Sequence, residues 1–405
     1  MIVTEITRKN IRNLYAEIFW FGILAGTTVT FLAVYASHIG ANGFQVGLLS
    51  AGPAVINLIV SVPAGGWLTG RSLYHISYKS GLYQRLFYLV IAVLPWLFGD
   101  KIQVWALIAL SLIIAIPGGV MAIAFNAMLA DIVPPGLRGE VVGKRNALVA
   151  ISMTITILIS GEILTRVIFP INYQVIFSLG ALGGLLSMIH IRRIMPHSSG
   201  LKPPIVRQDE KRQEVQIKAR LLRFDLLRGS FGFFMLAYLA FYTFQFAPQP
   251  LFPLFVVREL LFSDKVIGIG NALFYSVSVV FALLLSRFSR RFGHRKVLVI
   301  SGLFFAVYPL LVGLAVDTSL YYAASILGGV VWGLISGSLL NRLMERVPEG
   351  DRPAHMALHN IIFNLGILIG SLGGPLLGSF MDLRTAILVT AGLRMLAGVL
   401  MLMWG

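Results

Sequence analysis

The sequence predicts an all-α integral membrane protein with twelve transmembrane helices, arranged as two parallel halves of six helices each. Three observations support this prediction: a shortage of charged residues, the number of long apolar segments, and a motif that recurs half a chain apart. Of the 405 residues, 57% are hydrophobic and 12% are charged, whereas soluble domains carry about 25% charged residues. The chain therefore has too few charged side chains to cover a water-facing surface.

Twelve segments are long and apolar enough to cross a bilayer, which takes about 20 residues of helix. Such segments form helices because lipid offers no hydrogen-bond partner to the backbone. The first segment is too long for the core of a cleavable signal peptide. The predicted helices occupy residues 13–37, 45–68, 82–99, 103–129, 143–168, 171–191, 231–257, 266–288, 297–315, 319–343, 355–380 and 384–404.

The net charge of +16 is distributed unevenly along the chain. If the N-terminus is cytoplasmic, 27 of the 33 Lys and Arg residues precede the first helix or fall in or beside the inner loops. This bias follows the positive-inside rule, so basicity indicates topology and contact with anionic inner-leaflet lipid rather than nucleic-acid binding. We expect a multi-pass protein of the plasma or inner membrane with both termini in the cytoplasm.

The longest inner connection, residues 192–230, separates a first half (1–191) from a second half (231–405). It carries ten Lys and Arg residues. From about Gln208 to Arg228 its pattern is that of a basic amphipathic helix, which is typical of a segment on the membrane surface. The alternative, a simple tether between the halves, stays open.

An internal repeat indicates how the halves are related. The pattern acid-x-Val-Pro-x-Gly-x-Arg occurs at Asp131–Arg138 and again at Glu345–Arg352, 214 residues later. Both copies follow a helix that ends on the inner side, so the duplication is parallel rather than inverted. A further pair of related loops begins at Gly66 and at Arg291. In these features the chain resembles the major facilitator superfamily of secondary transporters.

In that family the two related loops belong to a charge network that closes the inner gate. The family's Asp is replaced here by Gly70 and Arg290, and we expect Asp131 and Glu345 to supply the missing negative charge. Alternatively, these loop charges only set the topology. The gate residues that the resemblance implies are Gly66, Arg71, Asp131, Arg138, Arg291, Gly293, Arg295, Glu345 and Arg352.

The resemblance also implies that helices one, four, seven and ten line a substrate cavity. Polar residues in membrane helices face cavities more often than lipid, and these four helices carry stripes of polar or small residues. Helix–helix packing is the alternative explanation of each stripe. The expected lining residues are Thr28, Tyr35, Asn126, Tyr238, Tyr242, Gln245, Gln249, Tyr322, Ser325, Trp332 and Ser336, with the small stripe Ser111, Ala115, Gly118 and Ala122. An aromatic, amide-rich lining with few charges suits a neutral, amphipathic or cationic organic molecule, not an anion.

Three charges fall inside predicted helices. Glu17 shares a face of helix one with Thr28, and a carboxylate that loses water takes up a proton more readily. We therefore expect Glu17 to couple transport to protons, with Arg12 as the local opposing charge. Glu162 and Arg166 have the spacing of an ordinary helical ion pair. For Arg394, near the middle of helix twelve, no acid of the second half lies at similar depth.

The sequence thus predicts a secondary active transporter, not an enzyme, that exports a small organic solute with protons by alternating access. Uptake or flipping of a nutrient or lipid-like solute is the alternative, and a lipid-modifying membrane enzyme is the alternative of another class. We expect a monomer whose partners are its substrate, protons or another coupling ion, and lipids. No cofactor or metal is expected, because the chain has no cysteine and His355 and His359 lack a third ligand. The nucleotide-binding loop of an ATP-driven pump is also missing.

Overall fold

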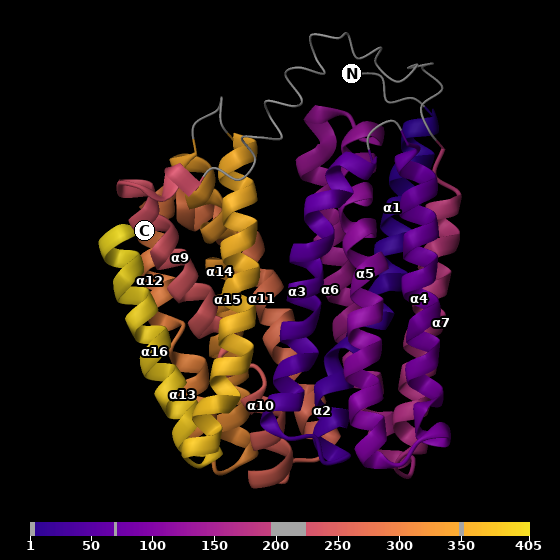
Figure 1. Ribbon diagram of the computed structural model, residues 1–405, viewed down its shortest axis with the longest axis vertical. Helices are drawn as coiled ribbons and strands as arrows, with labels where there is room; N and C mark the ends of the chain where they lie inside the picture. The colour runs from indigo at the N-terminus through magenta and orange to yellow at the C-terminus, as the bar shows by residue number, and fades with distance from the viewer. Residues whose placement is uncertain (1–4, 69–70, 196–223, 348–351) are drawn as a thin grey trace.

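The computed structural model describes residues 5–68, 71–195, 224–347 and 352–405. Within these ranges the backbone forms helices and turns, and no strand occurs. Twelve helices in the described ranges are long and apolar enough to span a membrane. The structure therefore confirms the predicted all-α class with twelve spans (Figure 1).

The two halves contribute six spans each. The first six are formed by α1 (Glu5–Leu24), η1 (Ala25–Val29), α2 (Thr30–His38), α3 (Gly43–Leu68), α4 (Leu73–Leu97), α5 (Asp100–Ile132), α6 (Pro135–Arg166) and α7 (Ile171–Arg192). After η2 (Phe224–Leu227), the last six are formed by α9 (Ser230–Phe246), α10 (Leu251–Leu254), η3 (Phe255–Glu259), α11 (Asp264–Phe292), α12 (His294–Phe304), α13 (Val307–Leu314), α14 (Thr318–Arg346), α15 (Arg352–Phe380) and α16 (Leu383–Trp404).

Figure 1 shows α1–α7 and α9–α16 as two bundles side by side. Helix α1 begins and α16 ends toward one end, which we call the terminus end, and α2 and α10 lie near the other, which we call the opposite end. Most of the linker that was predicted to form an amphipathic helix lies outside the described residues. The second copy of the repeat also falls partly outside them, because residues 348–351 are not described.

Several helices extend further than the apolar segments predict. Helix α4 begins at Leu73 instead of residue 82, and α6 begins at Pro135 instead of residue 143. The prediction was wrong at these boundaries because it followed hydropathy, while polar helical turns continue beyond the apolar core of the bilayer. As a result Arg85 and Arg145, which we counted with the loop charges, lie well inside helices and are buried.

Three spans that were predicted as continuous helices are interrupted. The first contains the π-helical turn η1, and π-turns are frequent at functional sites. The seventh is broken into turns at residues 247–250, and the ninth at residues 305–306. These interruptions place irregular backbone at mid-span in both halves.

Buried apolar clusters differ between the two ends. The largest cluster joins both halves, with Phe31 from the first and Leu254 from the second. Two other clusters each belong to a single half: one contains Ile132 near the terminus end of α5, and the other contains Leu343 near the terminus end of α14. The described halves therefore share a core toward the opposite end and keep separate cores toward the terminus end.

Glycines allow the halves to approach closely where they meet. Helix α3 packs on α15, and α6 packs on α11. A Cβ on Gly47 of α3 would lie 2.3 Å from the backbone oxygen of Ser371, and one on Gly268 of α11 would lie 3.5 Å from the Cα of Gly161 in α6. Further along α6, toward the terminus end, a Cβ on Gly143 would meet nothing within 4 Å.

Candidate functional site

A cavity of about 620 Å³ is lined by residues of both halves. The first half contributes residues of η1, α2, α3, α4 and α5, and the second contributes residues of α15. Four carboxamide side chains are among the lining: Asn57, Gln84, Asn360 and Asn364. An amide group carries both hydrogen-bond donors and an acceptor, so this lining can bind polar uncharged groups of either kind.

A second cavity of about 300 Å³ adjoins the first, because Val29, Ala33 and Ser50 line both. Its other lining residues come mainly from the second half and include two carboxamides and three tyrosines: Gln249, Asn271, Tyr275, Tyr308 and Tyr321. Among the described residues, no Asp, Glu, Lys or Arg lines either cavity. The two cavities together form a site whose described lining carries amide and aromatic groups and no charged side chain.

Two adjacent glycines in α5 make room for the amides of the larger cavity. A Cβ on Gly118 would lie 2.6 Å from the Nε2 atom of Gln84, and a Cβ on Gly119 would lie 3.0 Å from the Oδ1 atom of Asn57. Any side chain here would therefore push an amide away. Gly118 belongs to the small stripe that the sequence places on one face of this helix, and all four members of that stripe line the cavity.

Most of the predicted aromatic and polar lining residues make packing contacts instead. The Tyr35 hydroxyl donates to Gln103, and its ring lies 4.8 Å from that of Tyr173. In the second half the Tyr238 hydroxyl donates to the Leu339 carbonyl oxygen at 2.7 Å. A stripe of residues at helical spacing does not distinguish a cavity from a neighbouring helix.

The remaining predicted lining residues lie as follows. The Tyr242 hydroxyl is 2.9 Å from His359 Nε2, Ser325 donates to the Tyr321 carbonyl oxygen, and Trp332 stacks on Phe305. Thr28 and Gln245 are buried, Asn126 and Ser336 are exposed, and Tyr322 is half-buried. Of the eleven residues, Gln249 lines the smaller cavity.

Glu17 lies in a buried charge cluster of the first half. The side chain is 3% exposed, and its Oε2 accepts a hydrogen bond from Arg145 Nη2 at 2.9 Å. The expected local charge, Arg12, is thus not its ion-pair partner; Arg145, 128 positions away on α6, is. Among the described residues Glu17 is the only acid classed as buried. Breaking such a pair leaves an uncompensated charge inside the protein and is strongly destabilising.

A second arginine connects this cluster to the larger cavity. Arg85 is buried on α4, lies over the ring of Phe21 at 4.9 Å, and donates to Gln84 Oε1. Its positive charge also acts on Glu17. Gln84 lines the cavity. Arg85 therefore contacts an amide of the cavity and belongs to the same buried charge cluster as Glu17.

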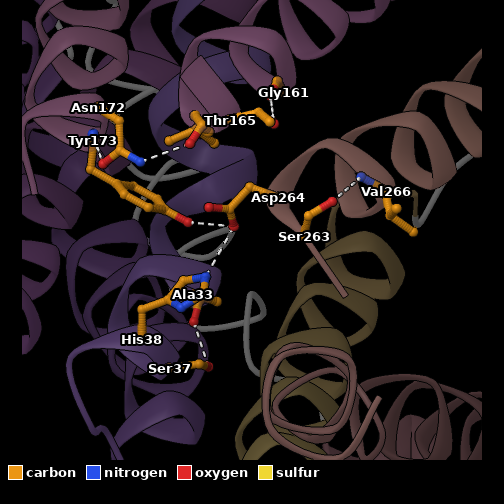
Figure 2. Close-up of polar contacts among 11 residues, drawn as sticks. Ala33, Ser37, His38, Gly161, Thr165, Asn172, Tyr173, Ser263, Asp264 and Val266 are labelled. Atoms are coloured by element: carbon orange, nitrogen blue, oxygen red, sulfur yellow. Dashed lines mark hydrogen bonds and ion pairs between the residues drawn. The ribbon is translucent and has the colours of Figure 1, made fainter. Parts of the chain in front are cut away.

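At the opposite end, polar side chains join the two halves. Asp264, in the first turn of α11, accepts hydrogen bonds from the Tyr173 hydroxyl at 2.8 Å and from His38 Nε2 at 3.0 Å (Figure 2). We call these three residues the Asp264 cluster. Ser263 caps the same helix by accepting from the Val266 amide, which fixes the position of the carboxylate.

Further polar contacts between the halves are close by. Arg258 in η3 donates to the carbonyl oxygens of Ser37, in the last turn of α2, and of Ala41, just beyond it, at 3.1 and 2.7 Å. Lys265 pairs with Glu162 of α6 at 2.8 Å. Glu162 thus bridges the halves in addition to making its expected pair with Arg166, a contact that helical spacing within α6 cannot reveal.

The chain matches a known family along most of its length. Its sequence agrees with the profile of the Major Facilitator Superfamily over residues 18–249 and 234–405. The chain belongs to the major facilitator superfamily. No curated protein sequence matches it.

Solved structures of major facilitator transporters have the same fold. A bacterial homologue of the iron transporter ferroportin in an inward-facing state has a TM-score of 0.74 and 15% identity, covering 100% of this chain and 99% of that one. The xylose transporter XylE from E. coli, in a partially occluded inward-open conformation, has a TM-score of 0.71 and 13% identity, covering 99% of this chain and 98% of that one. The nucleoside transporter NupG has a TM-score of 0.67 and 13% identity, covering 99% of each chain. At these identities the likeness shows the fold alone.

The signature loops of the family are only partly described. Gly293, at the start of α12, has a φ of +81°, a left-handed conformation that favours glycine. Glu345 pairs with Arg342 at 2.9 Å, not with Arg291, whose guanidinium lies over Phe292. Glu345 and Arg291 therefore make these contacts within their own half.

The other expected gate residues are placed as follows. Arg138 donates to the carbonyl oxygens of Ala130 and Val133, Arg295 donates to that of Leu402 at 3.2 Å, and Arg71 and Asp131 are exposed. Nothing is described of the surroundings of Gly66 or of the side chain of Arg352.

The two histidines with metal-ligand spacing make other contacts. The His355 ring packs edge-on against Phe231 at 4.6 Å, and His359 is hydrogen-bonded to Tyr242. Within the described ranges, no three His, Asp or Glu side chains come together as a metal site would require.

Proposed function

We propose that this member of the major facilitator superfamily is a secondary active transporter that moves a small, uncharged organic solute across the membrane by alternating access. The observation that carries the proposal is the cavity between the halves, which presents carboxamides and tyrosines without charged side chains. A buried charged substrate without an opposite charge would lose its hydration without compensation. The expectation of a neutral or amphipathic substrate is therefore favoured over that of a permanent cation.

We further propose that the present conformation is open toward the terminus end, and that this end faces the cytoplasm. The shared apolar cluster, the Asp264 cluster and the contacts of Arg258 lie toward the opposite end. Toward the terminus end each half has its own core. The surplus of Lys and Arg at the terminus end supports its cytoplasmic location through the positive-inside rule.

Proton-coupled export is our proposal for the mode of transport, with Glu17 as the group that exchanges the proton. Protonation of Glu17 would remove the negative charge that holds Arg145 at 2.9 Å. Both Arg145 and Arg85 would then lack their nearby anion, and Gln84, which Arg85 contacts, lines the cavity. Substrate binding and protonation would thereby compete for the arrangement of the same side chains.

A binding screen on purified protein tests the substrate class. Neutral, cationic and anionic solutes are added in turn, and the melting temperature is measured, because a ligand that binds the native state raises it. We expect neutral solutes with several hydrogen-bonding groups to stabilise the protein, and Asn57→Ala to reduce this shift. The matched control is Asn126→Ala, which removes an exposed amide outside the lining. Stabilisation by anions alone would contradict the proposal.

Transport in proteoliposomes tests the coupling. With an imposed pH gradient, wild-type protein should move a solute found in the screen faster than without one, and the direction of flux decides between export and uptake. Glu17→Gln should lose the response to the gradient but retain exchange, because glutamine can still accept a hydrogen bond from Arg145 without carrying a proton. If the variant responds as the wild type does, Glu17 is not the coupling site.

A further inference from the structure

Arg394 is a buried charge that the proposed transport cycle does not use. It lies near the middle of α16, is 2% exposed, and belongs to a span in contact with α9 and α12. Placing a charged side chain at such a depth costs free energy unless polar groups surround it. Among the described residues its hydrogen bonds go to two backbone carbonyl oxygens, not to a carboxylate.

The sequence of the seventh span explains why those carbonyls are available. In a helix each carbonyl oxygen accepts from the amide four residues later. The partner of Phe244 would be Pro248, and proline has no N–H. The partner of Gln245 would be Gln249, but its amide bonds instead to the Phe246 oxygen at 3.3 Å. The carbonyls of Phe244 and Gln245 are therefore left without backbone donors where the helix breaks.

The Arg394 guanidinium supplies both missing donors. Its Nε lies 3.2 Å from the Phe244 oxygen and its Nη2 lies 2.7 Å from the Gln245 oxygen. The fork of a guanidinium can reach two neighbouring acceptors at once, which the single ammonium of lysine cannot match. The guanidinium also lies over the ring of Phe305 at 4.1 Å, and Phe305 is at the interruption of the ninth span. A single side chain thus contacts the seventh and the ninth span where each is interrupted.

The segment beyond the break is attached to the other half. Residues 251–259 form α10 and η3, and Arg258 within them donates to carbonyl oxygens in the last turn of α2 and just beyond it. On the near side of the break, α9 packs against α15 and α16 of its own half. Gln249, within the break, lines the smaller cavity. The break therefore separates a part that packs within the second half from a part that contacts both halves.

We propose that Arg394 is a positioning residue that caps the fixed side of a hinge at residues 247–250, so that α10 and η3 can change direction while α9 stays helical. This inference deepens the proposed alternating access, since the hinge joins the cavity to the contacts at the opposite end. It does not depend on the substrate, because the bend of the seventh span is a property of the protein alone. A cap with no hinge function would affect stability without affecting that bend.

The bend can be measured as a distance between two spin labels, because the chain contains no cysteine and any pair can be introduced directly. One pair, L236C with E259C, places a label on α9 and another at the end of η3. A second pair, L236C with L396C, reports the packing of α9 on α16 and verifies that each variant is folded. Both pairs are studied in full-length protein in nanodiscs with Arg394→Lys and Arg394→Met.

Arg384→Met is the matched control. Arg384 also caps carbonyl oxygens, those of Gly313 and Ala315 at 2.8 and 3.1 Å. Its guanidinium lies over the ring of Phe255 in η3 at 5.1 Å, so it contacts the segment beyond the break without capping the carbonyls at the break. We expect Arg394→Met to raise the population outside the wild-type distance peak of the first pair about tenfold, as expected for the loss of hydrogen bonds from a charged donor. Arg394→Lys should broaden the peak less, and Arg384→Met, which removes a contact with Phe255 but no cap at the break, should change it least.

The second pair should keep the wild-type distance in every variant. If the second pair shows that Arg394→Met is not folded, the distance distribution of the first pair in Arg394→Lys decides whether the hinge depends on Arg394. A folded Arg394 variant with the wild-type distribution for the first pair overturns the hinge. So does an equal change in the Arg384→Met control. Neither result bears on whether the protein transports a neutral solute, so failure of the hinge and failure of the proposed function remain distinguishable.

Discussion

Three arginines buried within spans have three different kinds of hydrogen-bond partner. Arg145 pairs with a carboxylate, Arg85 donates to a cavity amide, and Arg394 donates to backbone carbonyls. The sequence identified Glu17 as the buried acid, yet it suggested Arg12 as its neighbour because helical spacing reveals only partners on the same helix. The true partner is set by the packing of α1 on α6, which pattern and hydropathy do not encode.

A double-substitution cycle measures the Glu17–Arg145 pair. Arg145→Met should be strongly destabilising, by about 3–5 kcal/mol, because it leaves the carboxylate buried without its partner. Adding Glu17→Gln to Arg145→Met should recover much of this loss, since no lone charge then remains. Melting temperatures of the two single variants and the double variant in detergent give the comparison. Simple addition of the two single effects would show that the residues do not act as a pair.

Asp264→Asn should loosen the opposite end, because an amide is uncharged and its oxygen accepts less strongly from Tyr173 and His38. The measurement is the rate at which N271C, in the smaller cavity, reacts with a membrane-impermeant thiol reagent added on that side. We expect this rate to increase in Asp264→Asn. Asp317→Asn is the control: Asp317 caps α14, at the same end of the molecule. Equal rates in the two variants would argue against a restraining role for the Asp264 cluster.

At the scale of elements, hydropathy correctly located twelve spans but missed the interruptions within three of them. A window of apolar residues looks the same whether or not its helix is continuous. The seventh span did carry a signal, since Pro248 and Pro250 each remove an amide donor. The π-turn η1 has no comparable signal in Ala25–Val29. Its position depends on how the first span packs against α6 and α7.

The close approach of α3 and α15 can be tested with a single methyl group. Gly47→Ala would place a Cβ 2.3 Å from the Ser371 oxygen, and overpacking of this kind costs about 1–3 kcal/mol. The control Gly143→Ala adds the same methyl to α6 where nothing lies within 4 Å, so it should be neutral or stabilising through helix propensity. We expect Gly47→Ala to lower the melting temperature relative to that control. Equal melting temperatures of the two variants would mean that α3 and α15 are not in close contact at Gly47.

At the scale of the whole molecule, the number of apolar segments and the 214-residue repeat were sufficient to predict twelve spans in two halves. Both report global properties: one reflects insertion into the membrane, and the other reflects duplication of a half. The cavity was predictable in kind, because the small stripe on α5 does line it. Its amides at Asn57, Gln84 and Asn364 were missed, since they lie on helices that the stripes did not include.

Reporter fusions test the orientation of the whole chain. A reporter that is active only in the cytoplasm should be active when fused after Pro203, in the linker, and after Gly405, at the C-terminus. The reason is the concentration of Lys and Arg on that side, which retains loops in the cytoplasm. A fusion after Asp382, between α15 and α16, serves as the control and should be inactive. Reporter activity after Asp382, together with no activity after Pro203, would show that the chain has the reverse orientation.

Because α6 and α11 are in close contact near their middles, a small rotation about that contact would move the ends of the helices much further. The two helices are joined at mid-length by the hydrogen bond between Thr154 and Ser276 and touch again at Gly161 and Gly268. From Thr154 to Gly136 the helix extends about 27 Å at 1.5 Å per residue. A change of about 10° in the crossing angle at this fulcrum would therefore displace the terminus end of α6 by about 5 Å. That is comparable to the width of a small solute, so a modest rotation at the pivot suffices to open or close a passage.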